Sequence, residues 1–188
     1  MSEQTVFMFN ASSADKPPGS GVMEKISIHD KKNNTYTNLK KFTNWRKMLS
    51  NEFMMINNKL EVNELIIDEK RWASVEHYLL SCHIKKKCAN NYTKLIIDGE
   101  YGTETISNIK TILKVKKYDY SNEDLQKALH AKFNLENNPH MCKVLIATKD
   151  AVLTSWKRGM QCELDTDGNK IAKSCDLTEK LMEIRTML

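Results

Sequence analysis

Residues 72 to 87 read Trp-Ala-Ser-Val-Glu-His-Tyr-Leu-Leu-Ser-Cys-His-Ile-Lys-Lys-Lys, and this stretch decides the fold. Its side chains recur at three- and four-residue steps, as on one face of a helix, at Trp72, Val75, Leu79, Cys82 and Lys86. Ser74 is a residue type that caps helix N-termini, and the closing lysines complement the negative end of the helix dipole. The stretch therefore predicts a helix that begins just after Ser74.

Glu76, Leu80 and His83 stand four and then three residues apart, so they share one side of this helix. Glu76 falls in the first turn, where the macrodipole favours a negative charge. An ionised, oriented carboxylate can activate a water molecule or stabilise an oxocarbenium-like sugar. The alternative is structural, because Glu76 can simply complete the helix N-terminus below Ser74. His77 points about 100° away around the helix, so we expect a packing or exposed histidine there.

Shorter elements are predicted on both sides of this helix. The strand candidates are Thr5 to Phe9, the apolar patch Leu65 to Ile67 followed by a turn at residues 68 to 70, and Ala151 to Ser155. The helix candidates start after Asn44, within residues 103 to 115, after Ser121, at Pro139 and at Asp176. Residues 24 to 40 and 159 to 174 are polar and are expected to form loops, the first as an exposed loop or insertion. The sequence thus predicts a mainly α fold with a few short strands.

Length and composition limit the class of protein. With 188 residues and no linker-like segment, the chain fits a single domain that spans residues 1 to 188. The net charge of +5 and the pI near 8.8 permit an anionic ligand but fall short of a typical nucleic-acid-binding domain.

The five cysteines are irregularly spaced, so we expect reduced thiols rather than disulfides. No second ligand pair accompanies Cys82, His83 and Cys88 to form a zinc site. No apolar run is long enough to cross a membrane, so we expect a cytoplasmic protein.

Several motifs resemble those of the NADAR family, also called YbiA-like. Residues 71 to 78 look like the family's Trp-Pro-Ser-Val/Ser-Glu-His-Tyr helix start, and residues 45 to 51 resemble its Trp-Arg-x-x-Leu-Ser-Asn-Phe motif. Residues 128 to 133 are similar to Ala-Leu-x-Ala-Lys-Phe, residues 144 to 153 to Leu-Leu-Ala-Thr-x-x-Ala-x-Leu, and residues 181 to 185 to Leu-Met-x-x-Arg. Phe9 with residues 15 to 19 resembles a variant found in some members from large viruses. These matches lie in order along nearly the whole chain.

The resemblance implies a YbiA-like, mainly helical domain and an N-glycosidase. Family members hydrolyse the N-glycosidic bond of phosphoribosylated riboflavin intermediates, and others remove ADP-ribose from guanine in nucleic acid. The family's catalytic glutamate maps onto Glu76. The expected substrate contacts are Asn51, His83, Trp72, Arg46, Lys132 and Arg185. Of these, the cationic residues Arg46, Lys132 and Arg185 are candidates to face a phosphate, although each can equally be structural.

The same resemblance implies a small ribosylated substrate, no cofactor, no metal and no obligate protein partner; it allows a nucleic-acid partner without requiring one. The location implied is the cytoplasm, that of the host if the chain is viral. Two departures stand out. The family commonly places Gln and Lys where this chain has Leu80 and His83, and Glu52 interrupts the Ser-Asn-Phe motif. A relative that binds ADP-ribose or a nucleotide without cleaving it is therefore the alternative from another class.

Overall fold

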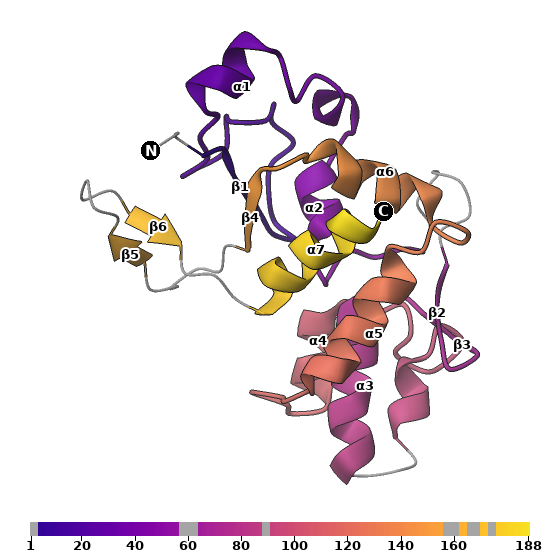
Figure 1. Ribbon diagram of the computed structural model, residues 1–188. Helices are drawn as coiled ribbons and strands as arrows, with labels where there is room; N and C mark the ends of the chain where they lie inside the picture. The colour runs from indigo at the N-terminus through magenta and orange to yellow at the C-terminus, as the bar shows by residue number, and fades with distance from the viewer. Residues whose placement is uncertain (1–3, 57–63, 88–90, 156–161, 165–169, 173–175) are drawn as a thin grey trace. The chain divides into compact units, whose positions relative to one another are not determined.

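The computed structural model describes residues 4–56, 64–87, 91–155, 162–164, 170–172 and 176–188. In these residues helices dominate and the strands are short, which confirms the predicted mainly α class (Figure 1). The chain forms two compact units: residues 1–50 together with 141–188, and residues 51–140. They are called unit 1 and unit 2 below and are described separately. The single domain expected for residues 1 to 188 stays a prediction.

Unit 1 is built on a parallel pair of strands from opposite ends of the chain. β1 (Val6–Phe9) pairs with β4 (Val152–Ser155), in a register that sets Val6 opposite Val152. α2 (Trp45–Leu49) packs on β1 and α7 (Asp176–Met187) packs on β4. Phe7 and Trp45 are buried edge to face, with ring centroids 5.3 Å apart. The unit also holds most of α6 (Pro139–Ala147).

Two segments predicted as loops contain regular structure. Residues 24 to 40 include α1 (Ile28–Lys32) and lead into the 3-10 helix η1 (Leu39–Lys41). Tyr36 and Leu39 are buried, so this segment is part of the core of unit 1 rather than an exposed insertion. Within residues 159 to 174, β5 (Cys162–Leu164) pairs antiparallel with β6 (Lys170–Ala172). Polar composition concealed the first segment, because its few buried residues are widely spaced.

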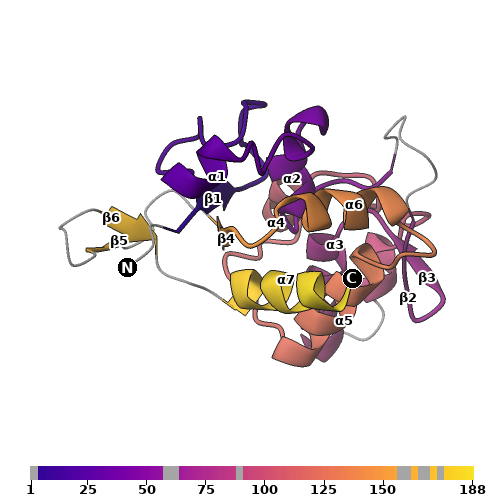
Figure 2. The same ribbon diagram turned by 45° about the horizontal axis from the view of Figure 1, so that its top comes forward.

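Unit 2 is arranged around α3 (Val75–Lys87), the helix predicted from residues 72 to 87. α5 (Asn122–Lys132) and the 3-10 helix η2 (Tyr92–Leu95) pack against it, and α3 and α5 lie side by side in Figures 1 and 2. The hairpin of β2 (Leu65–Ile67) and β3 (Lys70–Trp72) packs against α5 through β2. α4 (Ile106–Ile112) completes the unit.

α3 is buried on more sides than one apolar stripe predicts. Val75 and Leu79 are fully buried as expected, but so are His77 and Leu80, and His83 is only 7% exposed. Up to Ile84 the helix is therefore largely interior, whereas Lys85, Lys86 and Lys87 are exposed. Polar side chains on α3 therefore sit inside unit 2, where each must find a hydrogen-bond partner or leave a buried polar atom without one.

Candidate active site

The start of α3 fixes the position of Glu76. The Ser74 hydroxyl accepts a hydrogen bond from the His77 N–H at 3.3 Å, as the predicted N-cap should. The Glu76 N–H donates to the Asn51 carbonyl oxygen at 3.0 Å. The Glu76 side chain is half-buried in the first helical turn, where the dipole stabilises its negative charge.

A second segment of unit 2 covers the side of α3 that carries Glu76. The Tyr118 hydroxyl donates a hydrogen bond to Glu76 Oε1. One residue later, the Asp119 N–H donates to His83 Nδ1 at 3.1 Å. The segment between α4 and α5 thus donates a hydrogen bond to each of the polar residues Glu76 and His83. Sequence reasoning missed Tyr118, because residues 88 to 118 carry no recognised motif.

His83 presents one ring nitrogen with no partner. Because Nδ1 accepts the Asp119 N–H, the proton of a neutral ring is on Nε2. Nε2 is buried and has no hydrogen-bond partner among the described residues. Leu80, one turn before His83, is fully buried and apolar. The side of α3 from Glu76 to His83 therefore has a polar group at each end and an apolar centre.

Asn51 lies beside Glu76, as the family resemblance implies. It is 8% exposed, and its backbone oxygen holds the Glu76 N–H. Its side-chain Oδ1 is buried and, in the described part of the chain, has no hydrogen-bond partner. Leaving a buried polar atom unpaired costs about 1–3 kcal/mol. Asn51 Oδ1 and His83 Nε2 are thus two atoms of unit 2 that a ligand's polar groups can satisfy.

Lys132 is fully enclosed at the end of α5. It is 1% exposed, and its ammonium lies 5.8 Å and 5.4 Å from the ring centroids of Phe53 and Phe133. Burial lowers the pKa of Lys132 to about 7. A lysine with this pKa changes its protonation state near neutral pH, whereas a lysine with the ordinary pKa stays protonated.

Trp72 lies on a different side of α3 from Glu76. Its indole N–H donates to the Ile67 carbonyl oxygen at 3.2 Å, and its ring stands edge-on to Tyr78 at 5.4 Å. Tyr78 follows Glu76 by two residues and so points about 200° away around the helix. These contacts give Trp72 a packing role and provide no support for stacking on a substrate held by Glu76.

Arg46 and Arg185 belong to unit 1, and both are engaged there. Arg46 forms a buried ion pair with Glu24 at 2.6 Å, and its guanidinium also donates to the carbonyl oxygens of Lys16 and Pro17. Arg185 donates to Thr148 Oγ1 at 2.8 Å and to the Ala151 oxygen at 2.9 Å, and burial lowers its pKa. These bonds support the structural alternative for both arginines.

His77 is the packing histidine that its helical position predicts. Its Nδ1 lies 2.8 Å from the Ser74 hydroxyl and its Nε2 lies 3.0 Å from the Glu104 oxygen. Burial lowers its pKa to about 4, so the ring is neutral at physiological pH. His77 is thus part of the scaffold that positions the first turn of α3.

The described residues contain no group of three or more His, Cys, Asp or Glu side chains that could hold a metal ion. Within the same residues, no helix combines the length and the apolar character needed to cross a lipid bilayer.

Comparisons with known proteins give one structural similarity. The structure search matches the solution structure of the Escherichia coli protein YbiA over 100% of this chain and 86% of that chain, with a TM-score of 0.49 and 16% sequence identity. No protein-family profile matches the chain, and no curated protein sequence does so at a significant level. Membership of the NADAR family therefore stays a prediction from the motifs.

Proposed function

We propose that the protein hydrolyses the N-glycosidic bond of a ribosylated, phosphate-bearing substrate, with Glu76 as the catalytic carboxylate. The observation that carries the proposal is the setting of Glu76. Its half-buried carboxylate is held by Tyr118 next to Asn51, whose buried side-chain oxygen has no partner among the described residues. His83 adds a second such atom two helical turns away on the same side.

Glu76 has two ways to promote this reaction. It can take a proton from a water molecule that attacks the anomeric carbon, or it can stabilise the positive charge that develops on the ribose as the base departs. A carboxylate offers about four lone-pair sites, and Tyr118 donates to one of its two oxygens, Oε1. In either case the water oxygen bonds to the anomeric carbon, and the base leaves with its glycosidic electron pair and a proton.

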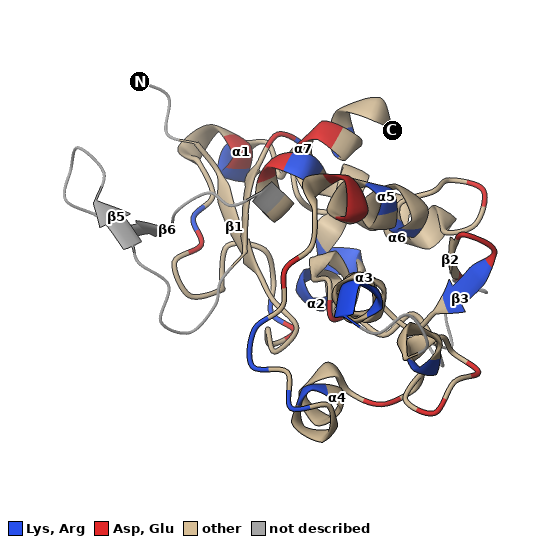
Figure 3. Cartoon of the chain, turned by 90° about the horizontal axis from the view of Figure 1, so that it is seen from below, with Lys and Arg blue, Asp and Glu red and all other residues tan. Residues whose placement is uncertain are grey.

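Lysines near Tyr118 suit a phosphate group. The Lys110 ammonium lies 4.8 Å from the Tyr118 ring centroid. Lys114, Lys116 and Lys117 are exposed on the segment that leads to Tyr118, and Figure 3 shows basic residues along this segment after α4. Four positive charges within eight residues of the chain raise the local concentration of an anionic substrate. This cluster takes over, in the proposal, the phosphate role predicted for Arg46 and Arg185.

The substrate class comes from the family resemblance. We put phosphoribosyl pyrimidines of the riboflavin pathway first, and ADP-ribose attached to guanine in nucleic acid second. The modest net charge of +5 supports a small phosphorylated metabolite over a long nucleic acid.

A non-catalytic binder of ADP-ribose or a nucleotide is the second candidate function. The observation that favours it is the fully buried Leu80, which cannot supply the hydrogen bond of the glutamine common in the family. Such a protein binds ADP-ribose in a calorimetric titration and releases no base.

The test is a chromatographic assay of base release from both substrate classes. We expect wild-type protein to release base, and Glu76→Gln to lose this activity while its circular dichroism spectrum is unchanged. Glu136→Gln, which alters an exposed carboxylate in the loop after α5, serves as the matched control and should retain full activity. Equal turnover by Glu76→Gln and wild type refutes the role of Glu76, and binding without base release by wild type favours the second candidate.

A further inference from the structure

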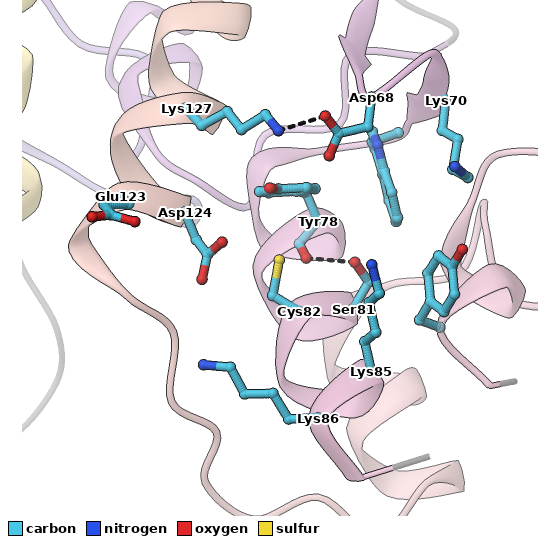
Figure 4. A pocket seen from close by; sticks show the side chains of 12 residues that line it. Asp68, Lys70, Tyr78, Ser81, Cys82, Lys85, Lys86, Glu123, Asp124 and Lys127 are labelled. Atoms are coloured by element: carbon cyan, nitrogen blue, oxygen red, sulfur yellow. Dashed lines mark hydrogen bonds and ion pairs between the residues drawn. The ribbon is translucent and has the colours of Figure 1, made fainter. Parts of the chain in front are cut away.

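A separate pocket lies on another side of α3. It has a volume of about 560 Å³ and is lined by residues from α3, α5, η2 and the β2–β3 hairpin, all in unit 2 (Figure 4). The α3 residues that line it include Tyr78, Ser81 and Lys85, which recur at three- and four-residue steps. Tyr78 points about 200° away from Glu76 around the helix axis. The pocket is therefore distinct from the candidate active site. Its volume falls in the range of about 300–1,000 Å³ found for small-molecule sites.

Lysines outnumber carboxylates among the residues that line the pocket by four to three, and the charge of Lys86 acts on Asp124, whose pKa it helps to lower. Lys70, Lys85 and Lys86 line it, and none of them takes part in a salt bridge with another described residue. Of the acidic residues, Asp68 is paired with Lys127. The remaining lining carboxylates, on Glu123 and Asp124, are in the first turn of α5, where the helix dipole offsets their charge.

The charges are also separated in space. Figure 4 shows Lys70 and Lys85 on one side of the pocket and Glu123 and Asp124 on the other. Asp124 accepts hydrogen bonds from the Ser121 hydroxyl at 2.8 Å and from its backbone N–H at 3.1 Å. Asp124 is thus held in the helix cap through Oδ2, and the side of the pocket with Lys70 and Lys85 is the one suited to an anion.

An aromatic ring adjoins these lysines. The Lys85 ammonium lies 5.2 Å from the centroid of the half-buried Tyr92 ring, which also lines the pocket. One ligand can therefore stack a planar ring on Tyr92 and set an anionic group against Lys85. Aromatic side chains bind bases by stacking, because every base has a π-face.

The pocket has no nucleophile suited to chemistry. Cys82 lines it, but burial raises the pKa of this thiol, which therefore stays protonated near neutral pH. The buried Ser81 hydroxyl donates to the Tyr78 carbonyl oxygen at 2.7 Å and belongs to the helix. The site is suited to binding rather than to reaction.

We propose that this pocket is a second ligand site that binds a nucleoside phosphate, with the base on Tyr92 and the phosphate between Lys70 and Lys85. The site is independent of Glu76, so a ligand held there does not occupy the candidate active site.

The test is isothermal titration calorimetry of the full chain with adenosine 5′-monophosphate, adenosine and inorganic phosphate. We expect the nucleotide to bind at least about tenfold more tightly than either part alone, because both the ring and the phosphate are recognised. The double variant Lys70→Ala/Lys85→Ala and the single variant Tyr92→Ala should each weaken nucleotide binding at least about tenfold.

The matched control is Lys31→Ala/Lys143→Ala, which removes two exposed lysines of unit 1 and the same total charge. It should leave nucleotide affinity unchanged. No nucleotide binding by wild type overturns the proposal, as does equal weakening by the control. Unchanged nucleotide affinity in Lys70→Ala/Lys85→Ala and in Tyr92→Ala places the nucleotide elsewhere and also overturns the proposal. A failure of base release leaves this result unaffected, so the two proposals are tested separately.

Discussion

The hydrogen bond from Tyr118 to Glu76 is the contact on which the site depends at the scale of single residues. A hydroxyl donor on one carboxylate oxygen orients the group and stabilises its ionised form. Tyr118 comes from the segment between α4 and α5, so the geometry of the first turn of α3 depends on a residue 42 positions away. We therefore regard Tyr118 as a positioning residue for Glu76.

Tyr118→Phe should lower kcat of base release about tenfold or more and leave KM within about threefold, because the ring stays while the hydroxyl donor is lost. Steady-state kinetics on the preferred substrate measures both constants. The control is Tyr101→Phe, which removes a hydroxyl that interacts with the exposed Glu100 at the surface of the same unit. A rise in KM at constant kcat contradicts a positioning role.

Lys132 links burial to the pH dependence of stability. Its pKa is about 7 in the folded protein, against roughly 10.4 for lysine in an unfolded chain. Between these values the unfolded chain binds more protons, so the free energy of unfolding rises with pH through this window. Relative to Lys132→Met, the wild type should gain about 2 kcal/mol between pH 7 and pH 9 in urea unfolding. Lys143→Met at the surface should show no such trend, and a flat difference for Lys132→Met contradicts the shifted pKa.

The helical pattern singled out Glu76 as a candidate carboxylate, whereas its catalytic role and the choice of Asn51 came only from the family resemblance. Helical periodicity placed Glu76 and His83 on one side of α3, and the structure agrees, since both meet the segment of Tyr118 and Asp119. Tyr118 could not be predicted as a partner of Glu76, because the two residues are 42 positions apart and residues 88 to 118 carry no recognised motif. Trp72 as a substrate contact stays a prediction, and the structure shows its ring edge-on to Tyr78.

At the scale of elements, local capping signals predicted helix starts well. Ser121 and Asp124 form the expected capping box at the start of α5, and α6 begins at Pro139. Asn138 stands at the position of an N-cap before Pro139, and its side-chain amide donates to the Glu64 and Ala131 oxygens. Caps are encoded by neighbouring residues, whereas such a bridge depends on residues that are distant in the chain.

Ser121→Ala should lower the free energy of unfolding by about 1 kcal/mol, because the Asp124 N–H loses the hydroxyl that caps α5. Urea unfolding followed by circular dichroism measures the change. Ser107→Ala, an exposed serine within α4, should change stability by less than about 0.5 kcal/mol. Equal effects of the two substitutions would show that the capping box does not stabilise the fold.

At the scale of the whole molecule, the division into two units was not predictable from local patterns. The parallel pairing of β1 with β4 joins segments about 146 residues apart, and nothing in either strand identifies its partner. The buried Arg46–Glu24 pair similarly connects α2 to the N-terminal segment of unit 1. A motif match to Arg46 suggested a phosphate contact, but both partners of this ion pair are almost completely buried.

Arg46→Met should destabilise the protein by about 3–5 kcal/mol, because it leaves the Glu24 carboxylate buried and unpaired. The double variant Arg46→Met/Glu24→Met removes both charges and should recover most of this loss. The single variant Glu24→Met completes the cycle, and chemical denaturation of the wild type and all three variants gives the comparison. If the double variant is as unstable as the sum of the two single variants, the two side chains do not act as a pair.

The role of Glu76 is tested most directly by the rate of base release under single-turnover conditions, with substrate affinity measured on the same preparations. We predict that Glu76→Gln lowers the rate at least about 100-fold and leaves affinity nearly unchanged, since the amide keeps the shape but cannot act as a base. An unchanged rate in this variant, with its fold intact, contradicts the assignment of Glu76 as the catalytic carboxylate.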